Sequence, residues 1–255
     1  MKKVVIALFL LVAVSVEAQR VLIVDREQLA PIVTGEHKNK LVSPNADPAE
    51  SRIRYAYFGL LSDKNEEYKD LANKIIYAYV HKVAIDTAYI PISEHLNLQF
   101  FKDALNNFFE SYNYVRFRLN VDDLPPYWLD MNIQIDTTTF KNYTQISLET
   151  TIFTGGAHPY LLNDYILIDN KTAQVVTWDK LLTDRTKFTA VAEKMTPKQM
   201  INLFENQKFV LSKNFVLTKK GINLIYLPSE LREWSNGTVL INIPKRKIKK
   251  YIHFN

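Results

Sequence analysis

The sequence predicts an α+β fold in which helices cover one face of an antiparallel meander sheet, arranged as two closely joined halves. Between residues 128 and 168, apolar and polar residues alternate in successive short runs, which is typical of half-buried antiparallel strands. Two earlier stretches, from residues 66 and 101, instead repeat apolar residues at helical spacing. A composition of 47% hydrophobic and 23% charged residues is that of a globular protein.

The first 18 residues have the features of a signal peptide. A basic start at residues 1–3 precedes an apolar run at residues 4–16, and small residues follow before Gln19. The run is shorter than the roughly 20 apolar residues of a membrane span. We therefore expect cleavage near Ala18–Gln19, export to the periplasm or the extracellular space, and no transmembrane span in the mature chain. An uncleaved N-terminal anchor is the alternative.

The expected N-terminal module covers residues 51–140. Residues 52–61 alternate and are rich in aromatic side chains, which favours a strand. Apolar residues at helical spacing predict one helix from Glu66 and a second around residues 101–112, with Asn97 as its N-cap. We expect both helices to pack on one sheet. Residues 19–50 show little periodicity and are predicted to be a loosely ordered lead-in, interrupted by four residues that break regular structure: Pro31, Gly35, Pro44 and Pro48.

The expected C-terminal module covers residues 141–255, with the division between the halves at 138–143. Alternation predicts adjacent strands that form a meander rather than βαβ crossovers, at residues 128–140 at the end of the N-terminal module and at 142–153, 160–168 and 175–178 in the C-terminal module. Two helical segments are predicted to begin at Asp184 and Pro197. A hairpin turning at 219–221, a strand at 238–243 and a short helix from Pro244 complete the prediction.

A pair of adjacent glycines lies between two predicted strands of this glycine-poor chain, which has six glycines in total. Gly155 and Gly156 suit a tight hairpin loop, because glycine reaches positive φ without steric penalty. Pro159 fixes its own φ, and His158 before it is biased toward extended geometry. The sequence therefore predicts a rigid imidazole beside exposed backbone at the end of a hairpin.

Residues 154–159, TGGAHP, resemble the T-G-G-A-H signature of a bacterial exported domain of unassigned activity. That domain forms the ectodomain of lysozyme-sensing anti-sigma factors and precedes the catalytic domain of certain peptidoglycan deacetylases. The resemblance continues through Asn163 and Tyr165, residues 169–182 and residues 225–244, although Ala173 replaces the family's glycine. It implies a role in the cell envelope, with a protein or glycan ligand that could be lysozyme-like.

The loop at residues 228–237 is a second candidate recognition surface, because tryptophan and arginine are favoured anchors of protein interfaces. The alternative is that its aromatic residues fill the core beneath a short helical turn. The candidate ligand-binding residues are drawn from the hairpin and from this loop with the strand before it: Thr154, Gly155, Gly156, His158, Tyr226, Glu230, Arg232 and Trp234.

The sequence offers little support for catalysis. The absence of cysteine excludes disulfides, thiolate metal sites and cysteine nucleophiles. No serine-hydrolase or phosphate-binding motif occurs, and the five histidines lack the spacing of metal ligands on one helix or strand. His158 is therefore interpreted either as a structural residue of the loop or as a ligand or general base.

These observations favour an exported envelope-binding protein that uses no catalytic residue, metal or cofactor. The net charge of +5 does not indicate a nucleic-acid partner for a protein outside the cytoplasm. One alternative is an envelope-glycan hydrolase or deacetylase-like enzyme that uses His158 with nearby carboxylates. The other is a dedicated lysozyme-binding or inhibitor protein.

Overall fold

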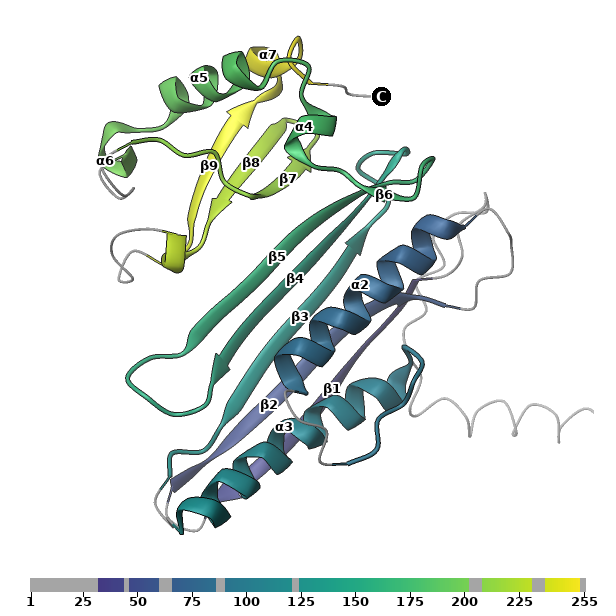
Figure 1. The fold of residues 1–255 in the computed structure, drawn as a ribbon, viewed down its shortest axis with the longest axis vertical. Helices are drawn as coiled ribbons and strands as arrows, with labels where there is room; N and C mark the ends of the chain where they lie inside the picture. The colour runs from purple at the N-terminus through teal and green to yellow at the C-terminus, as the bar shows by residue number, and fades with distance from the viewer. Residues whose placement is uncertain are drawn as a thin grey trace, which may run out of the picture.

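The structure, a computed structural model, describes residues 32–43, 46–59, 66–85, 90–120, 124–201, 208–230 and 237–252. The expected signal peptide and two site candidates, Arg232 and Trp234, lie outside these residues. The described chain has the predicted α+β architecture (Figure 1), with a six-stranded sheet, a three-stranded sheet and helices packed on them.

The larger sheet has the strand order β1-β2-β3-β4-β5-β6. β3, β4 and β5 form the predicted antiparallel meander. β2 and β3, which two helices separate in the chain, pair in parallel. The strands are β1 (Ile32–Ser43), β2 (Ala46–Phe58), β3 (Trp128–Asp136), β4 (Tyr143–Phe153), β5 (Tyr160–Asp169) and β6 (Gln174–Val175).

The strand β1 and the start of β2 correct the expectation of a loosely ordered lead-in. Residues 32–43 form β1, which pairs with residues 46–58 of β2 as an antiparallel hairpin at one edge of the sheet. Gly35, interpreted as a breaker, lies in β1 opposite Tyr55, where an added Cβ would come within 2.3 Å of the tyrosine hydroxyl. The glycine therefore makes room for an aromatic ring within a strand.

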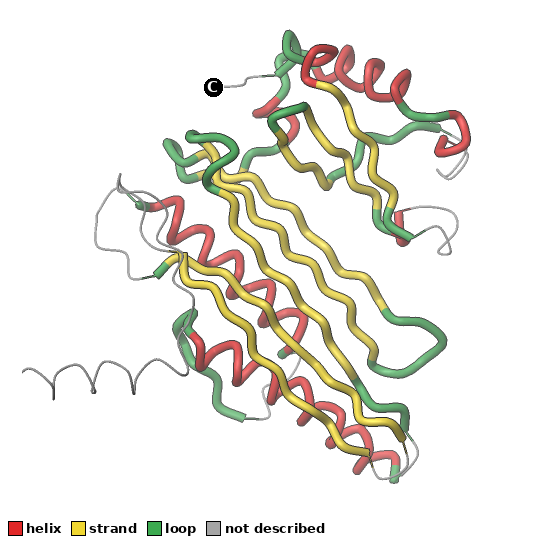
Figure 2. The backbone as a smooth tube through the Cα atoms, turned by 180° about the vertical axis from the view of Figure 1, so that it is seen from behind, coloured by secondary structure: helices red, strands yellow, loops and turns green. Residues whose placement is uncertain are grey.

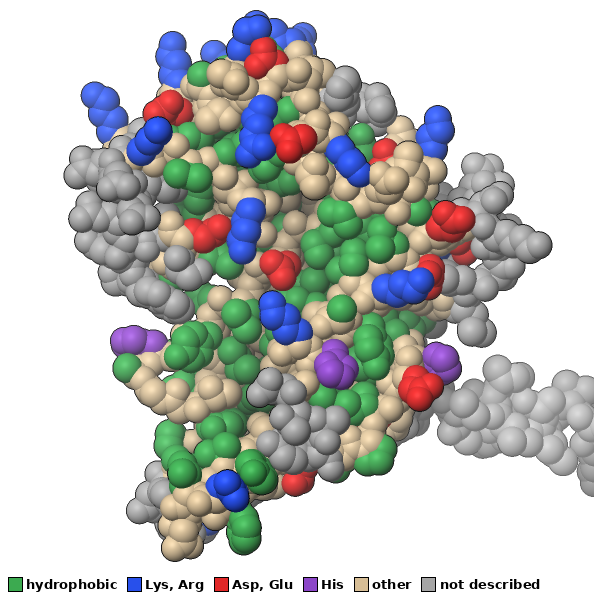
Figure 3. Space-filling view, viewed as in Figure 1, with side chains coloured by type: hydrophobic (Ala, Val, Ile, Leu, Met, Phe, Trp, Pro, Cys, Tyr) green, Lys and Arg blue, Asp and Glu red, His purple; other side chains and the backbone are tan. Residues whose placement is uncertain are grey.

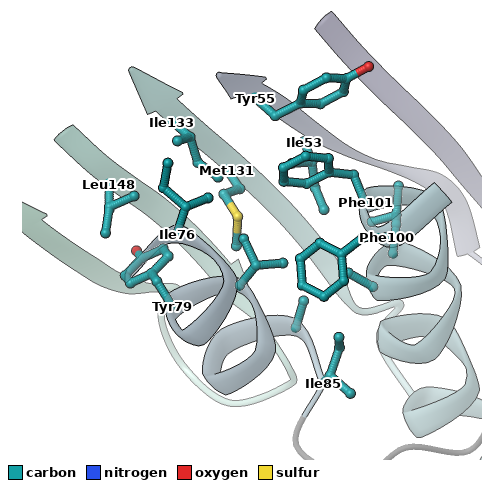
Figure 4. Packing of buried hydrophobic residues seen from close by; sticks show 14 of the residues in the cluster. Ile53, Tyr55, Ile76, Tyr79, Ile85, Phe100, Phe101, Met131, Ile133 and Leu148 are labelled. Carbon is teal, nitrogen blue, oxygen red and sulfur yellow. The ribbon is translucent and has the colours of Figure 1, made fainter. Parts of the chain in front are cut away.

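Helices α2 (Glu67–Ala84) and α3 (Leu98–Leu119) cover one face of the larger sheet, as predicted (Figure 1). The predicted N-cap of α3 is confirmed, because Asn97 accepts a hydrogen bond from the Phe100 backbone N–H at 2.9 Å. Figure 4 shows side chains of both helices pointing onto apolar residues of β2, β3 and β4. In this core the rings of Tyr55 and Phe101 stack with centroids 4.3 Å apart.

The smaller sheet is an antiparallel hairpin with a third strand and has its own apolar core. The strand predicted at residues 175–178 ends at Val175, because Trp178 begins a helix whose indole donates to the Ser212 carbonyl. The elements are β7 (Asn214–Thr218), β8 (Gly221–Tyr226), β9 (Val239–Pro244), α4 (Trp178–Leu181), α5 (Arg185–Met195), α6 (Lys198–Ile201), the 3₁₀ helix η2 (Pro228–Glu230) and α7 (Lys245–Ile248).

The smaller sheet and the helices around it, here called the smaller layer, contact the larger sheet at β4 and β5. Tyr143 and Leu167 belong to the core of the smaller sheet, and Gln145 Oε1 accepts a hydrogen bond from the Leu217 backbone N–H at 2.9 Å. β3 and β4 pair across the division expected at residues 138–143, so the larger sheet continues through it (Figure 2). On the view of Figure 3, lysine and arginine side chains gather at the end of the molecule formed by the smaller layer.

In the part of the chain that the structure describes, no helix combines the length and the apolarity needed to cross a membrane.

Candidate functional site

The glycine pair forms the loop of the β4–β5 hairpin. β4 ends at Phe153 and β5 begins at Tyr160, and Gly155 and Gly156 have φ values of 89° and 106°. An added Cβ at either glycine would meet no atom within 4 Å. The glycines are therefore required by backbone conformation and not by crowding.

The other candidates in this loop are exposed side chains. Thr154 and His158 are both exposed. The described residues provide no hydrogen bond or ion pair to the His158 imidazole, and they contain no group of three potential metal ligands. The structure thus presents the imidazole to solvent at the end of the hairpin.

The candidates around residues 226–230 have structural contacts. Tyr226 is 2% exposed, and its hydroxyl donates to the Val210 carbonyl at 2.8 Å, so it serves the smaller core. Burial raises the pKa of this phenol well above its usual range. Glu230 Oε2 accepts from the Leu227 backbone N–H at 2.8 Å and closes the turn that contains η2. Arg232 and Trp234 lie outside the described residues.

A polar cleft of about 370 Å³ lies beside this hairpin and was not predicted. Strand alternation directs most of its lining side chains to the face of the larger sheet opposite α2 and α3. Thr238, which follows the 228–237 loop, lines the same cleft, so segments distant in the sequence meet there. The lining residues are Arg54, Asp130, Asn132, Glu149, Thr150, Thr151, Leu161, Asn163, Tyr165 and Thr238.

An ion-pair cluster forms one side of the cleft. Arg52 donates two hydrogen bonds to Asp130, at 3.0 and 2.8 Å, and Arg54 donates one at 3.1 Å. The bonds from Arg52, together with the charges of both arginines, lower the pKa of the Asp130 carboxyl against the effect of its partial burial. Asp130 is therefore an anion at neutral pH and orients Arg54 along the cleft.

A second cluster links β3, β4 and β5. The Tyr165 hydroxyl donates to Glu149 Oε1 at 2.8 Å, and Asn132 Nδ2 donates to Glu149 Oε2 at 3.3 Å. Burial, the hydrogen bond and the negative charge of Glu149 all raise the pKa of Tyr165 well above its usual range. The phenol therefore stays protonated and holds the carboxylate in place.

The side chain of Asn163 is oriented by a hydrogen bond to the backbone of β4. Its Oδ1 accepts from the Thr150 backbone N–H at 3.1 Å. On the other face, the Tyr79 hydroxyl shares a hydrogen bond of 2.8 Å with Thr150 Oγ1 and donates to the Leu162 carbonyl at 2.6 Å. Helix α2 thus braces the strand positions that carry the cleft.

One feature of the sequence could have indicated the residues that line the cleft. Many outward positions of β3, β4 and β5 are polar, including Asp130, Asn132, Glu149 and Asn163, and the alternation assigns them only to a solvent-facing side. The resemblance pointed to Asn163 and Tyr165, but it did not indicate their partners Glu149, Asn132 and Thr150. Those partnerships depend on strand register.

A larger hollow of about 900 Å³ opens among the elements of the helical layer. None of the residues selected from the sequence as site candidates lines it. Its walls come from the ends of β1 and β2, from α2 and from residues 94–97, and include Tyr57, Tyr77, Asp70 and His95.

Comparison with known proteins identifies the fold. The structure resembles a DUF3298 family member from Bacteroides fragilis NCTC 9343, with a TM-score of 0.64 and 17% identity over 87% of this chain and 93% of that one. It also resembles a DUF3298 family protein from Pseudomonas aeruginosa PAO1, with a TM-score of 0.53 and 14% identity over 87% of this chain and 94% of that one. No family model matches the sequence, and no curated protein matches it. The chain thus has the fold of an uncharacterised domain family.

Proposed function

We propose that the protein is a non-catalytic binding protein of the cell envelope that recognises a protein or glycan ligand at the polar cleft. The basic and apolar start of the sequence supports export, and the TGGAHP resemblance supports an envelope setting. The observation that carries the proposal is the cleft itself, which gathers side chains from four strands and Thr238 beside the exposed hairpin.

The chemistry of the cleft suits a polar ligand without a large net charge. Two arginines and two carboxylates balance each other around it, at Arg52, Arg54, Asp130 and Glu149. Amide and hydroxyl groups supply further donors and acceptors, as glycan hydroxyls or peptide groups require. These side chains are held by one another before a ligand arrives, which lowers the entropic cost of binding.

The same contacts favour binding over catalysis. A carboxyl that acts as a general acid near neutral pH needs a raised pKa, whereas that of Asp130 is lowered by its arginines. Glu149 accepts hydrogen bonds from Tyr165 and Asn132, and the exposed His158 is not among the residues that line the cleft. The groups present therefore favour recognition of an intact ligand.

Binding can be tested by calorimetry against a panel of lysozymes and soluble peptidoglycan fragments. We expect at least one of these to bind and to be recovered chemically intact. Asn132→Ala should weaken that binding about tenfold, because one good polar contact contributes roughly 1–2 kcal/mol. Asn113→Ala is the matched control, since Asn113 is exposed on α3, outside the residues that line the cleft, and should bind like the wild type.

Two outcomes would change the assignment. The wild type could instead cleave or deacetylate the ligand, and folded Glu149→Gln or His158→Ala protein could lose that activity. This result would identify the protein as an enzyme that acts on envelope glycans. Equal binding by Asn132→Ala and the wild type would move the site away from the cleft. Slowed lysozyme turnover on complex formation would narrow the proposal to lysozyme inhibition.

A further inference from the structure

The strand β5 is the outer strand of the larger sheet along most of its length (Figure 1). β6 pairs with it only at Ile168 and Asp169, near its C-terminal end. Residues 160–166 pair with β4 on one side and with no strand on the other in the described part of the chain. This stretch begins directly after the TGGAHP loop.

The direction of its backbone groups follows from two hydrogen bonds. The Leu167 carbonyl accepts from the Val176 N–H at 2.8 Å, so residue 167 directs its backbone groups away from β4. The Asn170 N–H donates to the Asn142 carbonyl at 2.9 Å, so residue 170 directs its groups toward the β4 side. Because these directions alternate along an antiparallel strand, the outward residues of this stretch are Leu161, Asn163 and Tyr165.

These outward backbone groups have no partner among the described residues. Within the described ranges, no backbone hydrogen bond outside the β4 ladder involves Leu161, Asn163 or Tyr165. The side chains of the same three residues line the polar cleft together with Thr238. One row of residues thus offers unpaired peptide groups at the edge and side chains in the cleft.

This edge also lacks the features that normally prevent strand pairing. At the opposite edge of the sheet, β1 exposes Glu36, Lys38 and Lys40, and charged side chains of this kind discourage pairing with another chain. Residues 160–166, YLLNDYI, contain one charge and no lysine or proline, and Tyr160 and Leu162 are 53% and 41% exposed. An edge left in this state is suited to pairing with an added strand.

We infer that this edge binds an extended peptide segment of a partner protein as an additional strand. The inference rests on the proposed function and narrows its ligand to a peptide. Backbone hydrogen bonds to Leu161, Asn163 and Tyr165 supply affinity, and every second side chain of the peptide faces the cleft, as in other cases of strand addition. A second copy of this chain fits less well, because each copy would bring its own smaller layer, which reaches the cleft at Thr238, into the same space.

The experiment uses linear dodecapeptides displayed on phage and selected on the whole protein, followed by affinity measurements with synthetic peptides. Leu161→Pro removes one outward N–H and leaves the β4 ladder intact, since proline is tolerated at the solvent side of an edge strand. Leu161→Ala removes the side chain and keeps the N–H. We expect Leu161→Pro to weaken peptide binding about tenfold and Leu161→Ala to weaken it less than about threefold. Far-ultraviolet circular dichroism and thermal unfolding establish that both variants are folded.

N-methylation of the peptide is a second readout that does not depend on variant folding. Methyl groups should abolish binding at alternate residues of the peptide and be tolerated at the residues between them, because only alternate N–H groups face β5. Uniform tolerance, or equal binding by Leu161→Pro and the wild type, would overturn the inference. So would a dimer in sedimentation that Leu161→Pro dissociates, since a second copy would then occupy the edge.

The two proposals fail in different ways. Peptidoglycan fragments that bind through Asn132 while no peptide is selected would overturn strand addition and leave the cleft proposal standing. Failure of peptides, glycan fragments and lysozymes alike would overturn both.

Discussion

The Tyr165 hydroxyl donates to Glu149 Oε1 across the β4–β5 ladder at 2.8 Å, which places a protonated phenol and a carboxylate side by side in the cleft. Burial and the neighbouring carboxylate both raise the pKa of this tyrosine. The same direction of shift applies to Tyr79, where burial is the main cause, and to Tyr226.

These shifts predict a loss of stability at alkaline pH. A phenol whose pKa is higher in the folded than in the unfolded state stabilises the fold fully below about pH 10, and its contribution declines as the unfolded chain ionises above that pH. Each such tyrosine lowers the free energy of unfolding by up to about 1.4 kcal/mol per pH unit in this range. Urea unfolding between pH 8 and about pH 11 should show this decline, with a shallower slope in Tyr165→Phe. Parallel slopes for the two proteins would contradict the assignment.

Asp130→Asn tests the ion-pair cluster. At neutral pH we expect the free energy of unfolding to fall by about 1 kcal/mol, a modest value because water reaches all three partners. The side chains of Arg52, Arg54 and Asp130 are 38%, 39% and 31% exposed. The pKa of Asp130 is lowered in the folded state, so its contribution exists above about pH 4 and is lost as pH falls through the lower folded value. The difference between wild type and variant should therefore shrink toward pH 2; a constant difference would assign the loss to packing.

Ala173→Gly is expected to stabilise the protein. Ala173 has a φ of 49°, in the left-handed region where a Cβ is strained. Relief of this strain should outweigh the added flexibility of the unfolded chain and raise the free energy of unfolding by about 0.5–1 kcal/mol. Chemical denaturation measures the change. Lys171→Gly in the same turn serves as the control and should show no gain.

Gly155→Ala and Gly156→Ala test the hairpin loop, and both are expected to destabilise the protein. Each substitution should cost about 1 kcal/mol, because φ values of 89° and 106° are strained for alanine although no atom obstructs its methyl group. Ala157→Gly, in the same loop, should change stability by a few tenths of a kcal/mol. If both glycine substitutions were neutral in chemical denaturation, the loop would not be held in this conformation.

Local signals in the sequence predicted much of the fold. The alternation of residues 142–153 and 160–168 placed β4 and β5 within one residue of their observed ends. The cap Asn97 and the start of α5 near Asp184 were predicted because helix starts depend on residues only a few positions apart. β1 was missed because its glycine is explained by the ring of Tyr55, which is distant in sequence.

The candidate site was harder to predict from the sequence, again because its residues are distant from one another along the chain. The hairpin glycines were located from local chemistry, but the cleft combines Arg54, Asp130, Glu149, Asn163 and Thr238, which only strand order and register bring together. Tyr226 and Glu230 were selected for a recognisable motif, and their contacts lie in the smaller core and in a turn. Local sequence patterns indicate individual helices and strands. The cleft, in contrast, depends on which strands pair and in which register.

The most direct test of the cleft is hydrogen–deuterium exchange with and without the tightest-binding member of the peptide, glycan and lysozyme panel. The proposal predicts slower exchange in segments that contain Asp130–Asn132 and Leu161–Tyr165, with the ligand chemically unchanged afterwards. Protection confined to the hollow around Tyr57, Tyr77 and His95, or a ligand recovered in cleaved or deacetylated form, would contradict it.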